Sequence, residues 1–303
     1  MEDIRSEFIQ VTRPDGKVIR GLVEVSAAAD APHTPVVLLV PPYAKTIRDM
    51  FFASLYLTLN GFRTVRYDNT NHIGASDGRI FDYTLSSALE DLTNVLPAVR
   101  GRYPEAPLGV FSTSLGARIA FRALAGRDGV SLLVSLVGVV HVQDTLRRVM
   151  GRDFVEELLD GRLTTNIWEV LGYDVGRQFI EDAVGAGWYS RESAGKEVAA
   201  CLTPIMHIST EQDDWAHLPD VEAVFGNGSR APRELFVIPG SSHHLEKNPS
   251  AARLALVQAV AGLKRYTNGG RAEAGEIRCP NFVEFVRKNK HERHMEKIGY
   301  RAG

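Results

Sequence analysis

An apolar run that passes into a helix through one serine is the feature that most constrains this 303-residue chain. Residues 108–113 (LGVFST) are apolar enough for a buried strand, and residues 115–126 have the composition of a helix. Ser114 lies at the junction, with the small residues Ser112 and Gly116 two positions away on either side. Small residues there permit a tight turn that lifts a serine hydroxyl above the end of a sheet. The pattern predicts a nucleophile at Ser114; the alternative is a helix N-cap.

Strand-like and helix-like segments alternate on both sides of this motif. Strand-like runs occur at 36–40, 62–68, 131–140, 204–209 and 235–240, and helix-like runs at 47–60, 84–100 and 249–265. This alternation predicts an α/β fold with a mostly parallel central sheet and helices on both faces. Residues 4–25 are expected to form a hairpin ahead of it. Pro97 is expected to kink or end the helix over 84–100.

Residues 141–200 interrupt the alternation. They are mixed polar and helix-like, with glycines as breaks, and they are too many for a plain connection. We therefore expect residues 1–140 and 201–267 to form the core and residues 141–200 to form an inserted helical cap over the active site. Residues 268–303 are expected to be a basic C-terminal tail, because residues 287–297 read RKNKHERHMEK. A solvated surface helix or a frayed end is the interpretation we favour for it over a site for an anionic partner.

A serine becomes nucleophilic at neutral pH only beside a base, and in folds of this kind the chain order is serine, acid, histidine. His243 follows the last strand-like run and precedes a helix, which predicts that it is the base. Asp213 and Asp214 follow the run at 204–209 and compete for the role of the acid. The spacing from Asp213 to the small apolar Ala216 favours Asp213, and Asp214 would then cap a turn or a helix.

Two backbone N–H groups are needed to stabilise an oxyanion. The residue after the nucleophile, Leu115, supplies one, and the loop after the run at 36–40 supplies the other. Pro41 and Pro42 have no N–H, so Tyr43 is the predicted donor and Ala44 the alternative. His72 could line the site, although ordinary polar packing is the interpretation we prefer for it.

Composition excludes several classes of function. The formal net charge is −2, which gives no basic field for nucleic acid. No apolar stretch approaches the ~20 residues of a membrane span, and the sequence holds no metal-binding or phosphate-binding motif, so no cofactor is expected. Cys201 and Cys279 are distant and are predicted to be free thiols, and without a signal pattern the cytoplasm is the expected location.

Five stretches carry a resemblance to a known family: VRYDNTNHIGASDG, STSLGARIA, VGVVHVQDTL, EQDDWA and GSSHHLEKN. Their order and spacing are similar to those of the acyl transferases of bacterial bioluminescence, which act as myristoyl-acyl-carrier-protein thioesterases of the α/β-hydrolase superfamily. The resemblance runs from about Val36 to Asn248. It places the family's serine, aspartate and histidine on Ser114, Asp213 and His243.

The resemblance implies release of a fatty acyl group from a thioester of acyl-carrier protein or CoA, through an acyl-serine, to water or another acceptor. A synthetase or reductase that makes an aldehyde would be the downstream partner. Large apolar residues of the inserted segment, with Ala44, would then line an acyl tunnel, although ordinary cap core explains them equally: Phe154, Leu158, Leu159, Ile167, Trp168 and Leu171. Two alternatives remain, namely a carboxylesterase or lipase-like hydrolase of small esters, and a non-catalytic acyl-binding subunit.

Overall fold

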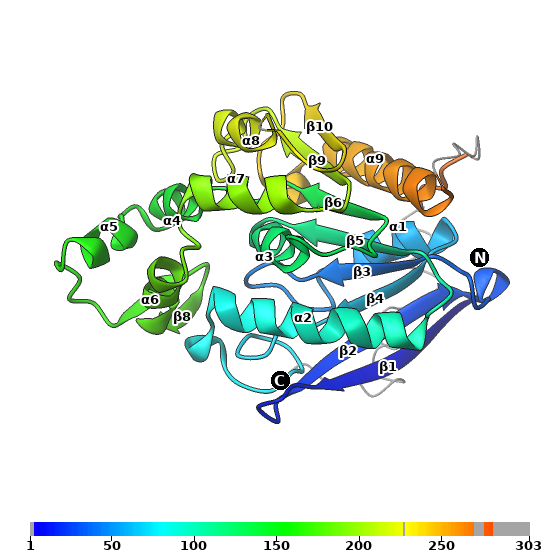
Figure 1. Cartoon of the computed structure of the whole chain (residues 1–303), viewed down its shortest axis with the longest axis horizontal. Helices are drawn as coiled ribbons and strands as arrows, with labels where there is room; N and C mark the ends of the chain where they lie inside the picture. Colours follow the sequence, from blue (N-terminus) through cyan, green and yellow to red (C-terminus); the bar gives the residue numbers. More distant parts are fainter. Residues whose placement is uncertain (1–2, 227, 270–275, 281–303) are drawn as a thin grey trace.

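The computed structural model describes residues 3–226, 228–269 and 276–280, and a twisted sheet runs through its centre (Figure 1). Within these residues the sheet has eight strands in the order β1-β2-β4-β3-β5-β6-β9-β10. The strands from β4 to β10 run parallel, and β1 and β2 form an antiparallel hairpin on one edge. The predicted fold class and the hairpin are therefore confirmed. The bounds are β1 Ile4–Thr12, β2 Val18–Ser26, β3 Val36–Val40, β4 Arg63–Tyr67, β5 Leu108–Thr113, β6 Leu132–Leu136, β9 Ile205–Thr210 and β10 Arg233–Ile238.

Continuous apolar runs form the central strands because both faces of the sheet are covered. Every residue of β3 and β6 is buried, as expected for parallel strands between two helical layers. α1 (Phe51–Leu59) and α9 (Pro249–Thr267) pack on one face. The other face carries α2 (Leu85–Arg102), α3 (Leu115–Leu124), α7 (Arg191–Ala200) and α8 (Leu218–Phe225).

Pro97 does not end its helix, which continues to Arg102. The buried residues Leu92, Val95 and Val99 lie on the inner face of α2, and their packing carries the helix past the proline. Pro97 itself is exposed, so the carbonyl that its ring leaves without a helical donor can face water.

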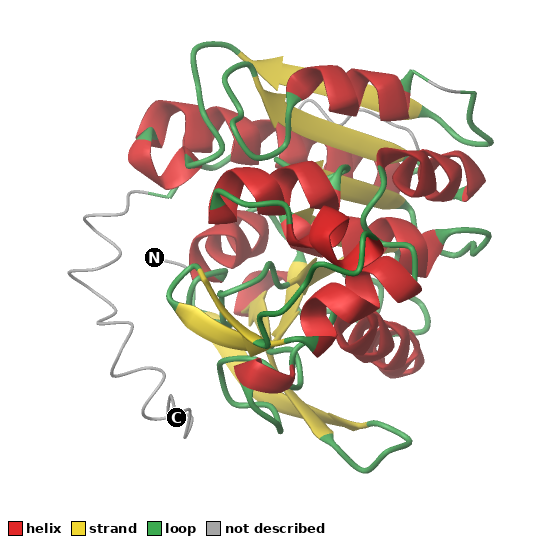
Figure 2. Ribbon diagram, turned by 90° about the vertical axis from the view of Figure 1, so that its left-hand side faces the viewer, coloured by secondary structure: helices red, strands yellow, loops and turns green. Residues whose placement is uncertain are grey.

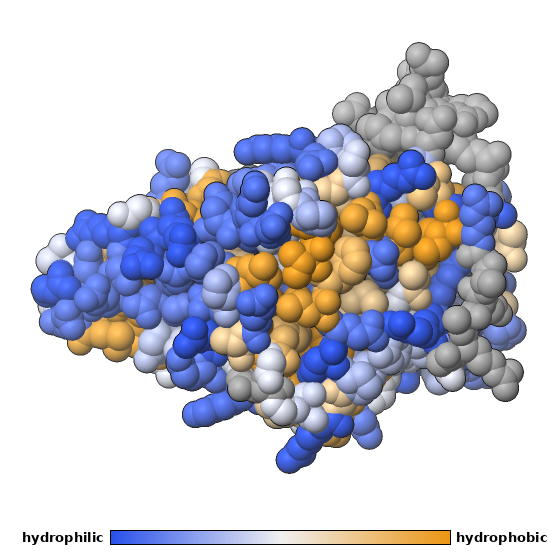
Figure 3. Space-filling view, turned by 90° about the horizontal axis from the view of Figure 1, so that it is seen from above, coloured by the Kyte–Doolittle hydropathy of each residue, from blue (hydrophilic) through white to orange (hydrophobic). Residues whose placement is uncertain are grey.

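Residues 141–200 connect β6 to β9 and contain both helices and strands. Among them α4 (Val142–Met150), α5 (Phe154–Leu159) and α6 (Gln178–Gly185) form a protruding lobe with the antiparallel hairpin of β7 (Ile167–Val170) and β8 (Tyr173–Gly176). Figure 2 looks onto this lobe, and Figure 3 shows that its outer surface is largely hydrophilic. The expectation of a helical cap was wrong at β7 and β8, which are strands. The expected boundary at residue 200 also differs from the packing, because α7 contacts α3 and α8 of the core.

The tail contacts the core where the structure describes it. Asn60 exchanges two hydrogen bonds with the backbone of Arg278, at 2.9 and 3.0 Å. The basic stretch at 287–297 lies outside the described residues, so our expectation for it stays a prediction.

Candidate active site

Ser114 stands between β5 and α3 in a strained backbone conformation. Its φ of 48° and ψ of −126° are unusual for a residue with a side chain. Backbone hydrogen bonds hold this turn: the Ser114 amide donates to the carbonyl of Leu136, and the Val139 amide donates to the carbonyl of Ser114. Ser114 occupies the N-cap position of α3, but its side chain makes no capping hydrogen bond. The hydroxyl is therefore left for another partner.

The two small residues beside the serine serve different purposes. A Cβ at Gly116 would lie 2.8 Å from the carbonyl oxygen of Pro41, so only glycine lets α3 begin this close to the end of β3. Ser112 is fully buried in β5, and its hydroxyl donates to the carbonyl of Val134 at 3.1 Å. Position 112 thus accepts a small polar side chain, whereas position 116 accepts no side chain.

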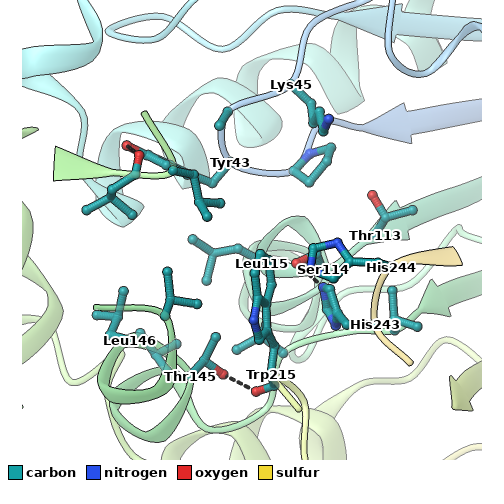
Figure 4. Close-up of a pocket in the computed structure, with 18 of the residues that line it drawn as sticks. Tyr43, Lys45, Thr113, Ser114, Leu115, Thr145, Leu146, Trp215, His243 and His244 are labelled. Atoms are coloured by element: carbon teal, nitrogen blue, oxygen red, sulfur yellow. Dashed lines mark hydrogen bonds between the residues drawn. The ribbon is translucent and has the colours of Figure 1, made fainter. Parts of the chain in front are cut away.

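A chain of hydrogen bonds links Ser114 to His243 and His243 to Asp213 (Figure 4 shows the first two residues). The serine Oγ lies 3.0 Å from His243 Nε2, and His243 Nδ1 lies 3.0 Å from each carboxylate oxygen of Asp213. His243 and Asp213 are buried, while Ser114 is partly exposed. The three residues come from the ends of β5, β9 and β10, which meet at one edge of the sheet because these strands are parallel.

Asp213 and Asp214 have opposite surroundings. The carboxylate of Asp213 accepts the amides of Trp215 and Ala216, at 2.9 and 2.7 Å, which fixes it toward His243. Asp214 is exposed. The turn that we expected Asp214 to cap is capped by Asp213 itself, and the spacing to Ala216 reflects that hydrogen bond.

Tyr43 and Leu115 border the space in front of the serine, in the loop after β3 and at the first position of α3. The amide at a first helical position has no acceptor within its helix. The Ala44 amide, our alternative to Tyr43, donates to Nε2 of His72 at 3.0 Å. That hydrogen bond favours Tyr43 as the second donor to an oxyanion.

His72 does not line the space in front of the serine, and the polar packing that we preferred for it describes its position. It is 3 % exposed, and burial lowers the pKa of its imidazole from 6.5 to about 4. The ring is therefore neutral near pH 7 and accepts the Ala44 amide. Its edge packs against Tyr43 and Tyr83, with ring centroids 5.5 and 5.0 Å away. Ala44 adopts a positive φ of 58°, a strained conformation that this hydrogen bond helps to hold.

A largely apolar cavity of about 540 Å³, here called the donor cavity, opens in front of Ser114 and His243 (Figure 4). Of the predicted lining residues, Ala44 and Leu171 border it. One wall is the inner face of α4, whose residues Val142, Leu146 and Val149 recur at helical spacing. That spacing was the signal in the sequence that we missed.

Five of the predicted lining residues lie elsewhere. Phe154, Leu158 and Trp168 do not border the donor cavity. The rings of Phe154 and Trp168 pack 5.2 Å apart and are nearly buried, so they form the core of the lobe. Leu159 and Ile167 are more than half exposed. Ordinary packing, the alternative that we left open, describes Phe154, Leu158 and Trp168, whereas Leu159 and Ile167 belong neither to the cavity nor to the core.

Trp215 is a further residue that the sequence did not single out. Its ring lies against His243, with centroids 4.7 Å apart, and it borders the donor cavity. It shields one face of the imidazole from water. Its place immediately after the two aspartates was the only signal in the sequence.

One cluster outside this site has the side chains of a metal ligand set. The ligand atoms of His141, Asp144 and Asp220 lie within 4.8 Å of one another. Arginines already compensate both carboxylates, because Asp144 pairs with Arg148 at 2.7 Å and Asp220 with Arg191 at 2.8 Å. The cluster is better described as an ion-pair network that ties α4 to α8.

Helices that could cross a membrane do not occur in the part of the chain that the structure describes. Solved structures with the same architecture include the esterase Est1E of Butyrivibrio proteoclasticus, determined with ferulic acid bound. Its TM-score is 0.67 at 19 % sequence identity, over 84 % of this chain and 99 % of Est1E. At this identity the likeness shows the α/β-hydrolase fold alone.

The amino-acid sequence is also similar to those of known acyl transferases. An acyl transferase of Aliivibrio fischeri is 32 % identical over 247 residues, which are 80 % of this chain and 79 % of the relative. An acyl transferase of Photorhabdus luminescens is 32 % identical over 248 residues, which are 81 % and 80 % of the two chains. The sequence model of the acyl transferase family matches residues 24–296. The chain belongs to the acyl transferase family.

Proposed function

We propose that this protein is a serine-dependent acyltransferase and thioesterase that takes a fatty acyl group from a thioester of acyl-carrier protein or CoA. The observation that carries the proposal is the hydrogen-bonded chain from Ser114 through His243 to Asp213, opening into the donor cavity. Family membership supports acyl transfer or hydrolysis in general. The apolar lining supports a fatty acyl group, since each buried methylene contributes ~0.8 kcal/mol.

In the first step His243 takes the proton of Ser114 as the hydroxyl attacks the thioester carbonyl. The amides of Tyr43 and Leu115 stabilise the oxyanion, at about 3 kcal/mol for each donor in comparable sites. Asp213 orients the imidazole and stabilises its protonated form. The thiolate leaves with the proton from His243, which gives an acyl ester on Ser114.

In the second step an acceptor attacks the acyl ester. His243 takes the acceptor's proton and returns it to the Ser114 oxygen as the ester bond breaks. Water as acceptor gives a fatty acid, and a protein partner such as a synthetase or reductase would receive that product. We also propose that the protein acts in the cytoplasm. The thioesters proposed as donors are cytoplasmic, and the two cysteines of the chain are free thiols, as is usual in that compartment.

A hydrolase of small esters is the second candidate, because the solved structures that share the fold include esterases. A non-catalytic acyl-binding role is disfavoured by the intact hydrogen bonds at Ser114. Intact-mass measurement of the purified protein after mixing with acyl-carrier-protein and CoA thioesters of increasing chain length tests the proposal. We expect an acyl adduct on Ser114 that forms faster with long chains. Faster turnover of short p-nitrophenyl esters than of any thioester would favour the esterase.

A further inference from the structure

A second cavity of about 370 Å³, here called the side cavity, lies beside the donor cavity on the α1 and α9 face of the sheet. Its buried lining is apolar and includes Leu39, Met50, Phe111 and Leu256. The charged residues that border it, Lys45, Asp49 and Glu246, have side chains between 41 and 70 % exposed. The charges therefore lie at the rim, and the interior suits an uncharged apolar group.

The two cavities adjoin next to Ser114 and His243, which themselves border only the donor cavity. Thr113, the neighbour of Ser114, and Leu245, two residues after His243, border both. The full set of shared residues is Pro42, Lys45, Thr113, Leu136, Leu245 and Glu246. The inserted segment borders only the donor cavity, so the two spaces differ in the elements that enclose them.

Acyl transfer needs room for two groups, one on each side of the bond that is made. The acyl chain would occupy the donor cavity, which α4 and the β7–β8 turn enclose. An acceptor must approach where His243 can take its proton, and the loop that carries His243 continues into the wall of the side cavity. We propose that the side cavity holds the hydrocarbon chain of a primary alcohol, which replaces water as the acyl acceptor. This inference rests on the proposed acyl-serine.

The chemistry follows the second step above with an alcohol in place of water. The alcohol oxygen attacks the carbonyl carbon of the acyl ester while His243 takes the hydroxyl proton. The bond from that carbon to the Ser114 oxygen breaks, and His243 returns the proton to Ser114. The products are an oxoester and free enzyme, with no change in oxidation state.

The experiment measures how the acyl-enzyme divides between water and alcohols. A medium-chain acyl-CoA is mixed with the protein and a fixed concentration of ethanol, butanol or hexanol, and ester and acid are quantified. Burial of each further methylene should raise the ratio of ester to acid by up to about fourfold. A ratio that is equal for ethanol and hexanol would overturn the proposal.

Two variants separate the cavities. Ala252→Phe, on α9, fills the side cavity, and Val149→Phe, on α4, narrows the donor cavity; both residues are partly exposed, so each helix can accept the larger ring. Ala252→Phe should abolish the preference for hexanol and leave acylation rates unchanged. Val149→Phe should slow acylation by long-chain acyl-CoA and leave the ratio of ester to acid unchanged for each alcohol. Ala53→Phe, on α1, repeats the first test from the facing wall.

The remaining outcomes are distinct. If Ala252→Phe and Ala53→Phe shorten the preferred acyl chain and leave the alcohol preference intact, the side cavity holds the acyl chain and the proposal is wrong. If the wild-type protein forms no acyl adduct with any thioester, the proposed function itself has failed. If the adduct forms and releases only acid with every alcohol, the proposed function stands and the acceptor site does not.

Discussion

The hydroxyl of Tyr43 donates a hydrogen bond of 3.2 Å to the carbonyl of Val170, at the end of β7. Tyr43 also borders the donor cavity in front of Ser114, so one residue connects the lobe to the proposed oxyanion site. Its ring is fixed on other sides by His72, Tyr83 and Phe179. The position of the lobe and the geometry of the oxyanion loop are thus mechanically linked.

Tyr43→Phe tests this link. The buried carbonyl of Val170 loses its donor, and we expect the free energy of unfolding to fall by about 1 kcal/mol. Acylation by long-chain thioesters and by a short activated ester should both slow several-fold, because the lobe no longer holds the loop that supplies the proposed oxyanion donor. Tyr173→Phe removes a hydroxyl from the same cavity and is the control. Unchanged rates with both substrates would contradict the link.

Ser114→Gly and Ser114→Ala separate strain from chemistry. Both remove the nucleophile, and turnover should fall by on the order of 10⁶. Glycine adopts the backbone conformation of position 114 without strain. The free energy of unfolding of Ser114→Gly should therefore be about 1 kcal/mol higher than that of Ser114→Ala. Denaturant titration gives the comparison. Retained turnover in Ser114→Ala would remove Ser114 from the mechanism.

Asp213→Asn should cost far more than Asp214→Asn. Loss of the carboxylate that orients the imidazole lowers kcat by about 10⁴ in comparable enzymes, whereas Asp214 is exposed and distant from that role. Acylation rates of the two variants, measured with one thioester, decide the matter. The reverse order would transfer the role to Asp214.

Leu171→Trp and Leu158→Trp form a matched pair in the inserted segment. Leu171 borders the donor cavity and Leu158 does not. Only Leu171→Trp should shift the preference toward shorter acyl chains, by about fourfold for each methylene excluded. Rates with a series of acyl-CoA substrates provide the test. A similar shift in Leu158→Trp would mean that the tunnel extends deeper into the lobe.

His72 should contribute a pH-dependent part of the stability. Its folded pKa of about 4 lies below the ordinary 6.5, so the folded state binds fewer protons than the unfolded state. The stabilisation is therefore present above pH 6.5 and is lost as the pH falls toward 4, by roughly 3 kcal/mol. His72→Gln keeps an acceptor for the Ala44 amide without this ionisation, so its unfolding free energy should fall less over that range.

Urea titrations at pH 7 and pH 5 measure this difference. Part of the dependence should remain in the variant, because burial also lowers the pKa of His207 to about 3. His72→Phe removes the acceptor altogether and should slow acylation by about tenfold, less than the 10²–10³ that loss of an oxyanion donor costs. If His72→Phe and His72→Gln are equally active, His72 has only a packing role.

The motif at Ser114 and the alternating segments allowed the sheet, its two helical layers and the grouping of Ser114, His243 and Asp213 to be anticipated. The β7–β8 hairpin was not anticipated, because its two-residue turn is Leu171-Gly172, with φ values of 53° and 86°. Leucine is disfavoured at such angles, so the usual Asn-Gly or Asp-Gly signal is missing. The partner of His72 could not be anticipated, because only the folded loop brings the Ala44 amide to its ring.

The unequal demands at Ser112 and Gly116 bear on how related enzymes can be found. A search string that requires glycine on both sides of a catalytic serine would pass over this chain, since the buried Ser112 hydroxyl is accommodated by a carbonyl of the neighbouring strand. At Gly116 the Pro41 backbone is too close for any side chain, so glycine is required there. A string with any small residue before the serine and an obligatory glycine after it would retrieve such sequences from uncharacterised genomes without loss of structural meaning.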